Sequence, residues 1–258
     1  PTLKVPASGQ SILSGTGTRL LSSFQGEAGP GQVVIEGSSQ WIGTGTMVGY
    51  YSFRWENAGV LTVTQPSSFV WGGLGNGPRF INTGSATFQS NFTFTSAAVG
   101  NHNAIAVTGG FLNFGGSYLT NEAALTLAPN AQLQLDPSST AFLRGSLTAP
   151  TPDSIRFRGA DVHLETLNVA TPSLWQSGGT VRQKVENVVN RYNQSGGTWF
   201  VSVPTSISTY ALTNGEYRGQ GLVATNFYWA DGTINRDGDG SRPTLKVPAS
   251  GQSILSGS

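Results

Sequence analysis

The sequence predicts an all-β protein folded as a parallel β-helix, a solenoid in which short strands stack coil upon coil. Strands of about four residues recur along the chain, with apolar residues at positions i and i+2 of each strand. Turns containing glycine or asparagine separate the strands, and the pattern returns at roughly 20 to 25 residues per unit. Only 10% of the 258 residues are charged and 35 are glycine, so the usual helix-forming residues are scarce.

A solenoid follows from the strand length, because four residues are too few for a stable sheet with a single partner. When equivalent strands stack, each pairs with the coil above and the coil below, and the alternating apolar residues fill one narrow core. We expect glycine and asparagine at the corners, where sharp bends need positive φ angles. The alternative is a tandem pair of antiparallel β-sandwich domains, but their strands are longer, at about 5 to 10 residues.

The first elements are short strands around turns. Apolar Leu3 and Val5 precede a Pro-Ala-Ser-Gly turn at 6–9, and apolar Ile12 and Leu13 follow it. β-Branched residues predict the next strand at 32–36, and glycines divide the apolar stretch 41–53 into short pieces. Each of these pieces is long enough for one strand of a coil.

From residue 55 the rhythm is regular. An Asn-Ala-Gly turn at 57–59 leads into a strand at 60–63, where Leu61 and Val63 share one face. The same order of turn and strand continues, with further strands expected at 69–71, 86–88, 92–94, 111–114, 125–127, 133–135, 155–157, 162–169, 199–201, 222–223, 227–229 and 231–234.

One segment departs from the pattern. Val181, Val185, Val188 and Tyr192 fall near helical spacing, in the most charged part of the chain. The segment 181–194 is either a short helix that protrudes towards a partner or another coil with a polar outer face. Gly-Gly-Thr turns on both sides favour another coil.

The chain repeats its own beginning. Residues 1–15 and residues 243–257 both read PTLKVPASGQSILSG, and the match stops where Thr16 is answered by Ser258. We interpret residues 1–242 as one period of a tandem array and residues 243–258 as the start of the next period. The alternative is an engineered duplication or the scar of a circular permutation.

The residues of the last part also carry a resemblance. Phe-x-Trp-x-x-Gly-Thr-Ile at 227–234, followed by Leu-x-Val at 245–247 and Gly-x-x-Ile-Leu at 251–255, resembles the β-solenoid repeats of giant bacterial cell-surface and secreted adhesin-like proteins. The resemblance implies an extracellular, right-handed β-helix that forms a fibre or an adhesin. The chain departs from those proteins in the length of its near-identical period.

Composition excludes several classes of function. The net charge is +1 and the cationic residues are scattered, which argues against nucleic acid as a partner. The absence of cysteine excludes disulfides and thiolate chemistry. No apolar run reaches the ~18 residues that cross a bilayer.

The acidic residues do not assemble into an obvious catalytic site. Asp231, Asp237 and Asp239 lie close in sequence but lack the further oxygen ligands of a calcium loop. Asp161-Val-His163-Leu-Glu165 places three titratable side chains on one face of a strand, where pairing with Arg156 and Arg158 on the preceding strand is the simplest interpretation. We therefore predict no enzyme activity, no metal and no cofactor. Two glycosylation sequons are present, at Asn91 and Asn193.

These observations favour a structural protein, a repeat unit of an extracellular fibre or giant surface adhesin whose periods stack end to end by β-strand addition. The residues expected at the seam between periods are Thr2, Leu3, Lys4, Val5, Phe227, Tyr228, Trp229 and Ile234. The alternative is a carbohydrate-binding or polysaccharide-degrading β-helix, whose sugar-stacking aromatics would be Trp41, Trp55, Trp71, Tyr50, Tyr51 and Trp175. The expected partners are adjacent copies of the repeat and extracellular carbohydrate.

Overall fold

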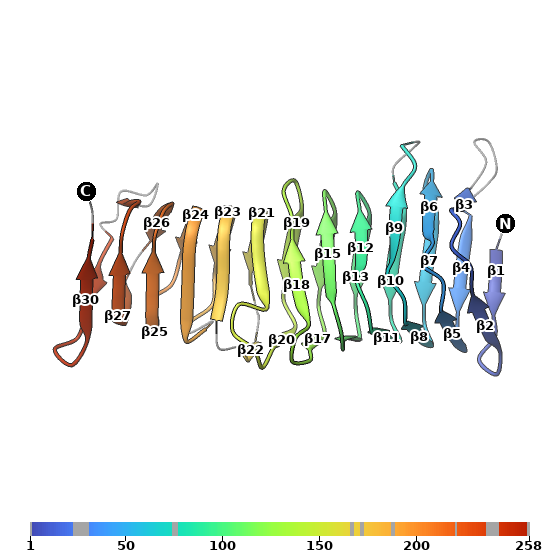
Figure 1. The fold of residues 1–258 in the computed structure, drawn as a ribbon, viewed down its shortest axis with the longest axis horizontal. Coiled ribbons are helices and arrows are strands. Elements are labelled where there is room, and N and C mark those ends of the chain that lie inside the picture. The colour runs from blue at the N-terminus through green and yellow to red at the C-terminus, as the bar shows by residue number, and fades with distance from the viewer. Residues whose placement is uncertain are drawn as a thin grey trace.

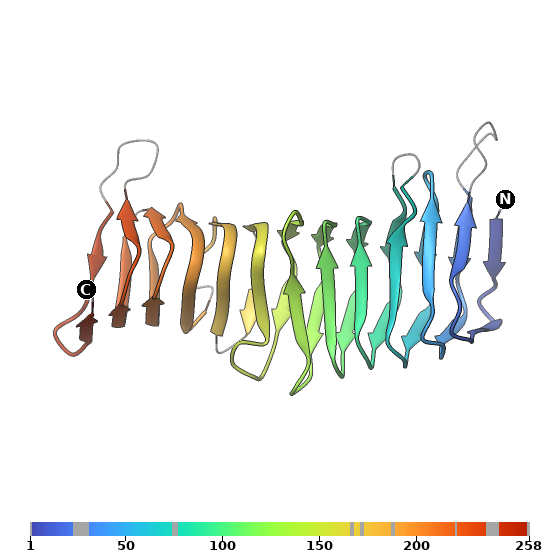
Figure 2. The ribbon, with the colours of Figure 1, turned by 45° about the horizontal axis from the view of Figure 1, so that its top comes forward.

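The computed structural model describes residues 2–22, 31–73, 77–165, 168–170, 173–186, 189–219, 221–235 and 243–256. These residues form strands and turns and contain no helix. The strands stack into a long parallel β-solenoid, with the two ends of the chain at opposite ends of the molecule (Figures 1 and 2). The predicted fold is confirmed. The β-sandwich alternative is wrong, because every described strand pairing is parallel.

The coils follow three columns in a fixed order, and we number the columns by that order; the described residues of 184–190, which pass column 2, form no strand. Column 1 holds β1 (Thr2–Val5), β4 (Gln32–Ile35), β7 (Arg54–Asn57), β10 (Arg79–Asn82), β13 (Ala98–Asn101), β16 (Tyr118–Asn121), β19 (Thr140–Leu143), the second halves of β21 (Ile155–Leu164), β23 (Ser173–Gln183) and β24 (Arg191–Val201), then β26 (Glu216–Gly219) and β28 (Thr233–Asn235).

Column 2 follows column 1 along the chain. It holds β2 (Gln10–Leu13), β5 (Ser38–Trp41), β8 (Val60–Val63), β11 (Ser85–Phe88), β14 (Ala104–Val107), β17 (Ala124–Leu127), β20 (Ser146–Thr148) and β22 (Asn168–Ala170), and in the last coils the first halves of β25 (Thr205–Leu212) and β27 (Leu222–Trp229), then β29 (Leu245–Lys246).

Column 3 completes the coil. It holds β3 (Arg19–Ser22), β6 (Thr46–Tyr50), β9 (Ser67–Trp71), β12 (Phe92–Thr95), β15 (Phe111–Gly115), β18 (Gln132–Leu135), the first halves of β21, β23 and β24, the second halves of β25 and β27, and β30 (Gln252–Leu255).

The core lies between the columns and is filled by every second residue of each strand. In β7, for example, Trp55 and Asn57 are buried while Arg54 and Glu56 face outwards. Because parallel pairing places equivalent residues above one another, the aromatic rings pack against the rings of neighbouring coils. Phe94 stacks on Phe114 of the next coil with ring centroids 5.3 Å apart, and Tyr210 stacks on Phe227 of the next coil at 5.7 Å.

Coil length varies more than the sequence pattern suggests. The first coil is long, because Thr2 pairs with Gln32, whereas the coil that joins Glu216 to its partner Thr233 is little more than half that length. The shorter coils arise where one long strand bends around a corner without a loop. In β24 the bend contains Gly197, whose φ is +76°, and a Cβ there would lie 2.4 Å from the carbonyl oxygen of Gly179 in the coil below.

The segment with apparent helical spacing is part of two ordinary coils. Its described residues belong to β23, β24 and the turns between them, with Val181 and Tyr192 fully buried. The interpretation as another coil is confirmed for these residues, while Val188 lies outside the described residues. None of the described residues forms a helix long and apolar enough to cross a membrane.

Candidate functional site: the two ends of the solenoid

The first coil exposes part of the core. Each of its strands β1, β2 and β3 pairs with one described strand, namely β4, β5 and β6. Leu3 lies in register with Val33 and therefore faces inwards, yet 64% of its surface is exposed. A shallow hollow of about 350 Å³ opens here, lined by Thr2, Leu3, Leu20, Leu21, Gly31, Gln32, Val33 and Phe53.

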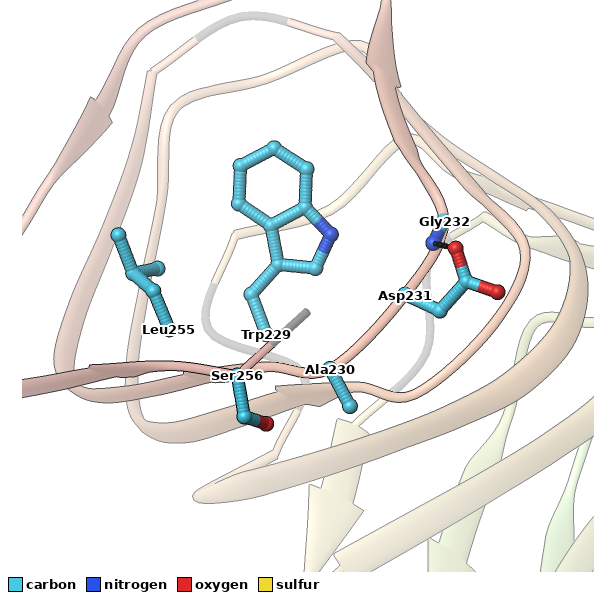
Figure 3. Close-up of a pocket in the computed structure, with 6 residues that line it drawn as sticks. All are labelled: Trp229, Ala230, Asp231, Gly232, Leu255 and Ser256. Carbon is cyan, nitrogen blue, oxygen red and sulfur yellow. Dashed lines mark hydrogen bonds between the residues drawn. The ribbon is translucent and has the colours of Figure 1, made fainter. Parts of the chain in front are cut away.

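The last coil exposes the core at the opposite end. Leu255 of β30 lies in register with Trp229 of β27 and is 68% exposed. Figure 3 shows the indole ring of Trp229 between Leu255 on one side and Asp231 and Gly232 on the other. A hollow of about 330 Å³ is lined by Trp229, Ala230, Asp231, Gly232, Leu255 and Ser256. Both ends thus present apolar side chains beside strand edges that no described strand covers.

The repeated fifteen residues can be compared at the two ends. In both copies the glycine of the Pro-Ala-Ser-Gly turn donates its N–H to the proline carbonyl, at 2.7 Å for Gly9 to Pro6 and at 2.8 Å for Gly251 to Pro248. The stretch also keeps its inward and outward faces: Leu13 lies opposite buried Trp41, and Leu255 lies opposite half-buried Trp229. The local structure of the segment is therefore the same in both places.

The predicted seam residues lie at or next to these ends. Thr2, Leu3, Lys4 and Val5 form β1 on the first coil, where Lys4 makes an ion pair of 2.8 Å with Glu36. Phe227, Tyr228 and Trp229 pair with Ser253, Ile254 and Leu255 of the second copy. Ile234, in β28, pairs with Tyr217 of the preceding coil.

Sequence reasoning missed part of this contact. Leu222 and Val223 pair with Leu245 and Lys246, so the second copy of Leu3 and Lys4 lies on β27 and not on β28. The order of strands around the coil is the signal that could have revealed it, because the strand after β28 belongs to column 2.

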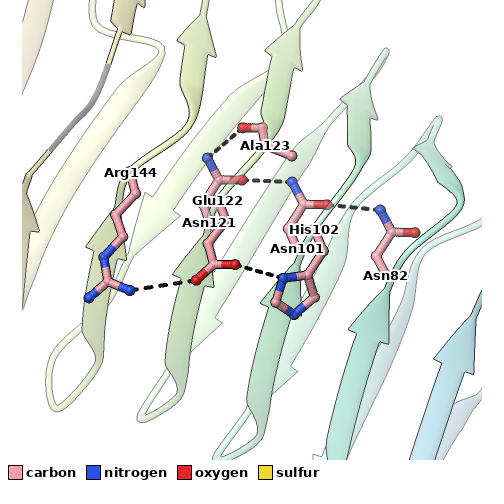
Figure 4. A network of polar contacts seen from close by, with 7 residues as sticks. All are labelled: Asn82, Asn101, His102, Asn121, Glu122, Ala123 and Arg144. Carbon is pink, nitrogen blue, oxygen red and sulfur yellow. Dashed lines mark hydrogen bonds and ion pairs between the residues drawn. The ribbon is translucent and has the colours of Figure 1, made fainter.

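A row of alternating charges follows the corner between columns 1 and 2, remote from both ends (Figure 4). His102 contacts Glu122 at 2.8 Å, Glu122 contacts Arg144 at 3.5 Å, and Arg144 contacts Glu165 at 2.7 Å. The hydrogen bond from Arg144, assisted by one from Lys184, lowers the pKa of Glu165, and the same bond raises the pKa of Arg144. Each side chain in this row contacts a partner in the coil above or below, so the row links successive coils of the stack.

A second row runs inside the same corner. The side-chain amides of Asn57, Asn82, Asn101 and Asn121 are buried and donate in series, each Nδ2 to the Oδ1 of the next, at 2.7, 2.8 and 2.6 Å. None of the four has a positive φ. The expectation that corner asparagines mainly supply such angles is wrong here, because their side chains satisfy one another and the backbone of the next coil.

The predicted partners of the Asp161–Glu165 face are also wrong. Val162 and Leu164 do point inwards, but Asp161 pairs with Arg182 at 3.4 Å, and Glu165 pairs with Arg144 and Lys184. Arg156 and Arg158 lie in column 3, before β21 bends at Gly159, so they contact other residues. Arg156 lies over Trp175, and Arg158 pairs with Asp136 at 3.4 Å.

No metal site forms within the described residues, where no three His, Asp or Glu side chains cluster. Asp231 accepts the N–H of Gly232, and Asp237 and Asp239 lie outside the described residues. Both sequon asparagines are half-buried and engaged: Asn91 Oδ1 accepts the N–H of Phe111, and Asn193 Nδ2 donates to Asp153.

Two of the six aromatics proposed for sugar stacking lie in the core. Trp41 and Trp55 are fully buried, whereas Trp175 is half-buried with the guanidinium of Arg156 over its ring. Tyr50 and Tyr51 are half-buried, whereas Trp71 is 37% exposed. A scan of protein-family models and searches of curated proteins and of solved structures return no match to this chain.

Proposed function

We propose that the chain is one period of a structural rod, an extracellular fibre or surface adhesin whose periods stack end to end by β-strand addition. The observation that carries the proposal is the second copy of the first fifteen residues. This copy, which begins the next period, extends the solenoid by pairing with β27. The repeated sequence therefore supports the next period as the occupant of the open end.

Physical chemistry supports the stacking. Inward-facing Leu3 and Leu255 are mostly exposed, and covering one such side chain completely is worth roughly 1.5–3 kcal/mol. The strand edges of the terminal coils carry backbone N–H and C=O groups that an added parallel strand would pair. Both contributions act only along the axis, so growth is linear.

The test is electron microscopy of a chain in which residues 1–242 precede the full 258-residue sequence. We expect a single continuous rod, longer than the one-period protein by roughly 45–55 Å, given ~4.8 Å between paired strands. Two separate particles joined by a tether would overturn the proposal. As a control, a chain with a flexible Gly/Ser linker between the periods should show whether the direct junction is what produces the continuous rod.

A further inference from the structure

We infer that successive periods of the rod are turned about its axis by one face of the solenoid, so that each strand of one period lies in the next column in the following period. The inference deepens the proposed function and rests on it. It concerns how the open end of one period receives the first coil of the next.

The order of strands requires this rotation about the axis. In every described coil the chain passes from column 1 to column 2 to column 3. The first copy of the repeated stretch places β1 in column 1 and β2 in column 2. The period ends with β28 in column 1, so the second copy enters column 2 as β29 and column 3 as β30.

Chain length excludes an arrangement without the rotation. Without it, the second copy would begin in column 1, as the first copy does, and Thr244, the equivalent of Thr2, would lie on Thr233. Thr233 itself pairs with Glu216 in column 1. No described coil is shorter than the one from Glu216 to Thr233, yet the step from Thr233 to Thr244 covers less than two thirds of that length of chain. So short a connection reaches the adjoining column but does not complete a coil.

The repeated fifteen-residue segment fits both positions, columns 1 and 2 at the start of the solenoid and columns 2 and 3 at its end. Its turn and its inward residues are the same in both copies, and Val5 and Val247 both pack towards the core. Behind the turn, Gly9 lies against Gly37 in the first copy, and Gly251 lies against Thr225 in the second, so the same corner is accommodated at two different edges of the solenoid.

The rotation between periods changes the direction in which the outer surface of each column faces. Column 1 carries an outward row in which Phe142 stacks on His163 at 4.4 Å, and Arg182 and Arg218 lie over the ring of Phe200 at 5.0 and 5.4 Å. In an array turned by one face per period, this row faces three directions in succession and returns after three periods. A surface that contacts partners through it would be displayed all around the rod.

Cysteine cross-linking of the two-period chain tests the inference, and the absence of native cysteine removes background. Val223→Cys with Lys246→Cys joins outward residues that are paired in the turned junction. Asn235→Cys with Lys246→Cys joins outward residues that would be paired if β28 received the repeated stretch in phase. Directly paired strands bring the Cα atoms within the range that a disulfide spans.

We expect the 223/246 pair to oxidise in most chains and the 235/246 pair at least ten-fold less, as counted by free thiols and by mass spectrometry of the linked peptides. If the rods are continuous and the 235/246 pair closes preferentially, the inferred rotation is wrong and the proposed function is unaffected. Tethered separate particles in which neither pair closes would overturn both. Each single-cysteine variant serves as a control for folding.

Discussion

At the scale of single residues, the solenoid depends on side chains that repeat at the same place in successive coils. The asparagine row and the charge row run side by side at one corner, one buried and one exposed. The buried row contributes more to stability. A buried amide that loses its partner cannot form a hydrogen bond with water instead, whereas each member of an exposed ion pair can.

Replacing Asn101 by alanine should therefore be costly. The change removes the acceptor of Asn82 Nδ2 and the donor to Asn121 Oδ1, both in a buried row. We expect a loss of about 2–4 kcal/mol in the free energy of unfolding, from two partly unsatisfied amides and a small cavity. Urea unfolding followed by tryptophan fluorescence measures it. Asn103→Ala, at an exposed asparagine in the following turn, is the matched control, and equal losses in the two variants would refute a special role for the row.

Glu165 should give the stability a dependence on acid pH. Its pKa is lowered in the folded state by the hydrogen bonds from Arg144 and Lys184, so its contribution is complete above the unfolded value of about 4.3 and is lost as pH falls through the folded value. Because its cationic partners are well exposed, Glu165→Gln should cost only about 0.5–1 kcal/mol at pH 7. At pH 3 the gap between variant and parent should narrow. Thermal melts of parent and variant at both pH values measure this difference in stability, with exposed Glu186→Gln as the reference variant. An equal difference at pH 3 and pH 7 would contradict the lowered pKa of Glu165.

At the scale of the elements, close approach between coils at the corners is as important as apolar alternation within strands. Gly59 ends the turn into β8, and a Cβ there would lie 2.0 Å from the carbonyl oxygen of Gly37 in the coil below. The contact involves backbone on both sides, so no side-chain rotation can relieve it. The corner therefore sets the spacing of the coils.

Gly59→Ala should accordingly destabilise the protein by about 2–3 kcal/mol or more, since the backbone of two coils has to shift. Gly115→Ala is the matched control, because a Cβ at Gly115 meets nothing within 4 Å and its φ is ordinary. We expect Gly115→Ala to lie within about 0.5 kcal/mol of the parent. Equal unfolding midpoints for the two variants would show that the corner contact is softer than its geometry implies.

The same elements show what sequence alone can and cannot provide. Alternation such as Leu61 with Val63 is local, so strands and fold class were predictable. The partners of Glu165 lie a whole coil away along the chain, and coils differ nearly two-fold in length, so local pattern does not reveal which residues meet. For this reason local pattern assigns the corner asparagines to turns and gives Arg158 the wrong partner.

At the scale of the whole molecule, the ends decide stability, because each coil otherwise contacts only its neighbours. A chain of stacked units gains one junction for each added period while the number of open ends stays at two. In the proposed array, the exposed inward residues Leu3 and Leu255 would become covered at each junction. Stability per period should therefore rise from one period to two and then level off.

The last prediction measures that gain at the junction. In the two-period chain the urea midpoint should exceed that of the one-period chain, because the junction buries apolar residues worth roughly 1.5–3 kcal/mol each. Val247→Asp places a charge at an inward position that packs against the core, and it should cancel most of the gain. Lys246→Asp introduces the same residue at the adjacent, exposed and outward position, where it removes only an exposed ion pair like that of Lys4 with Glu36, worth about 0–1 kcal/mol, and it should leave the gain largely intact. If both variants keep the higher midpoint, the periods do not share a core, because a continuous core cannot tolerate an unpaired buried carboxylate at its seam.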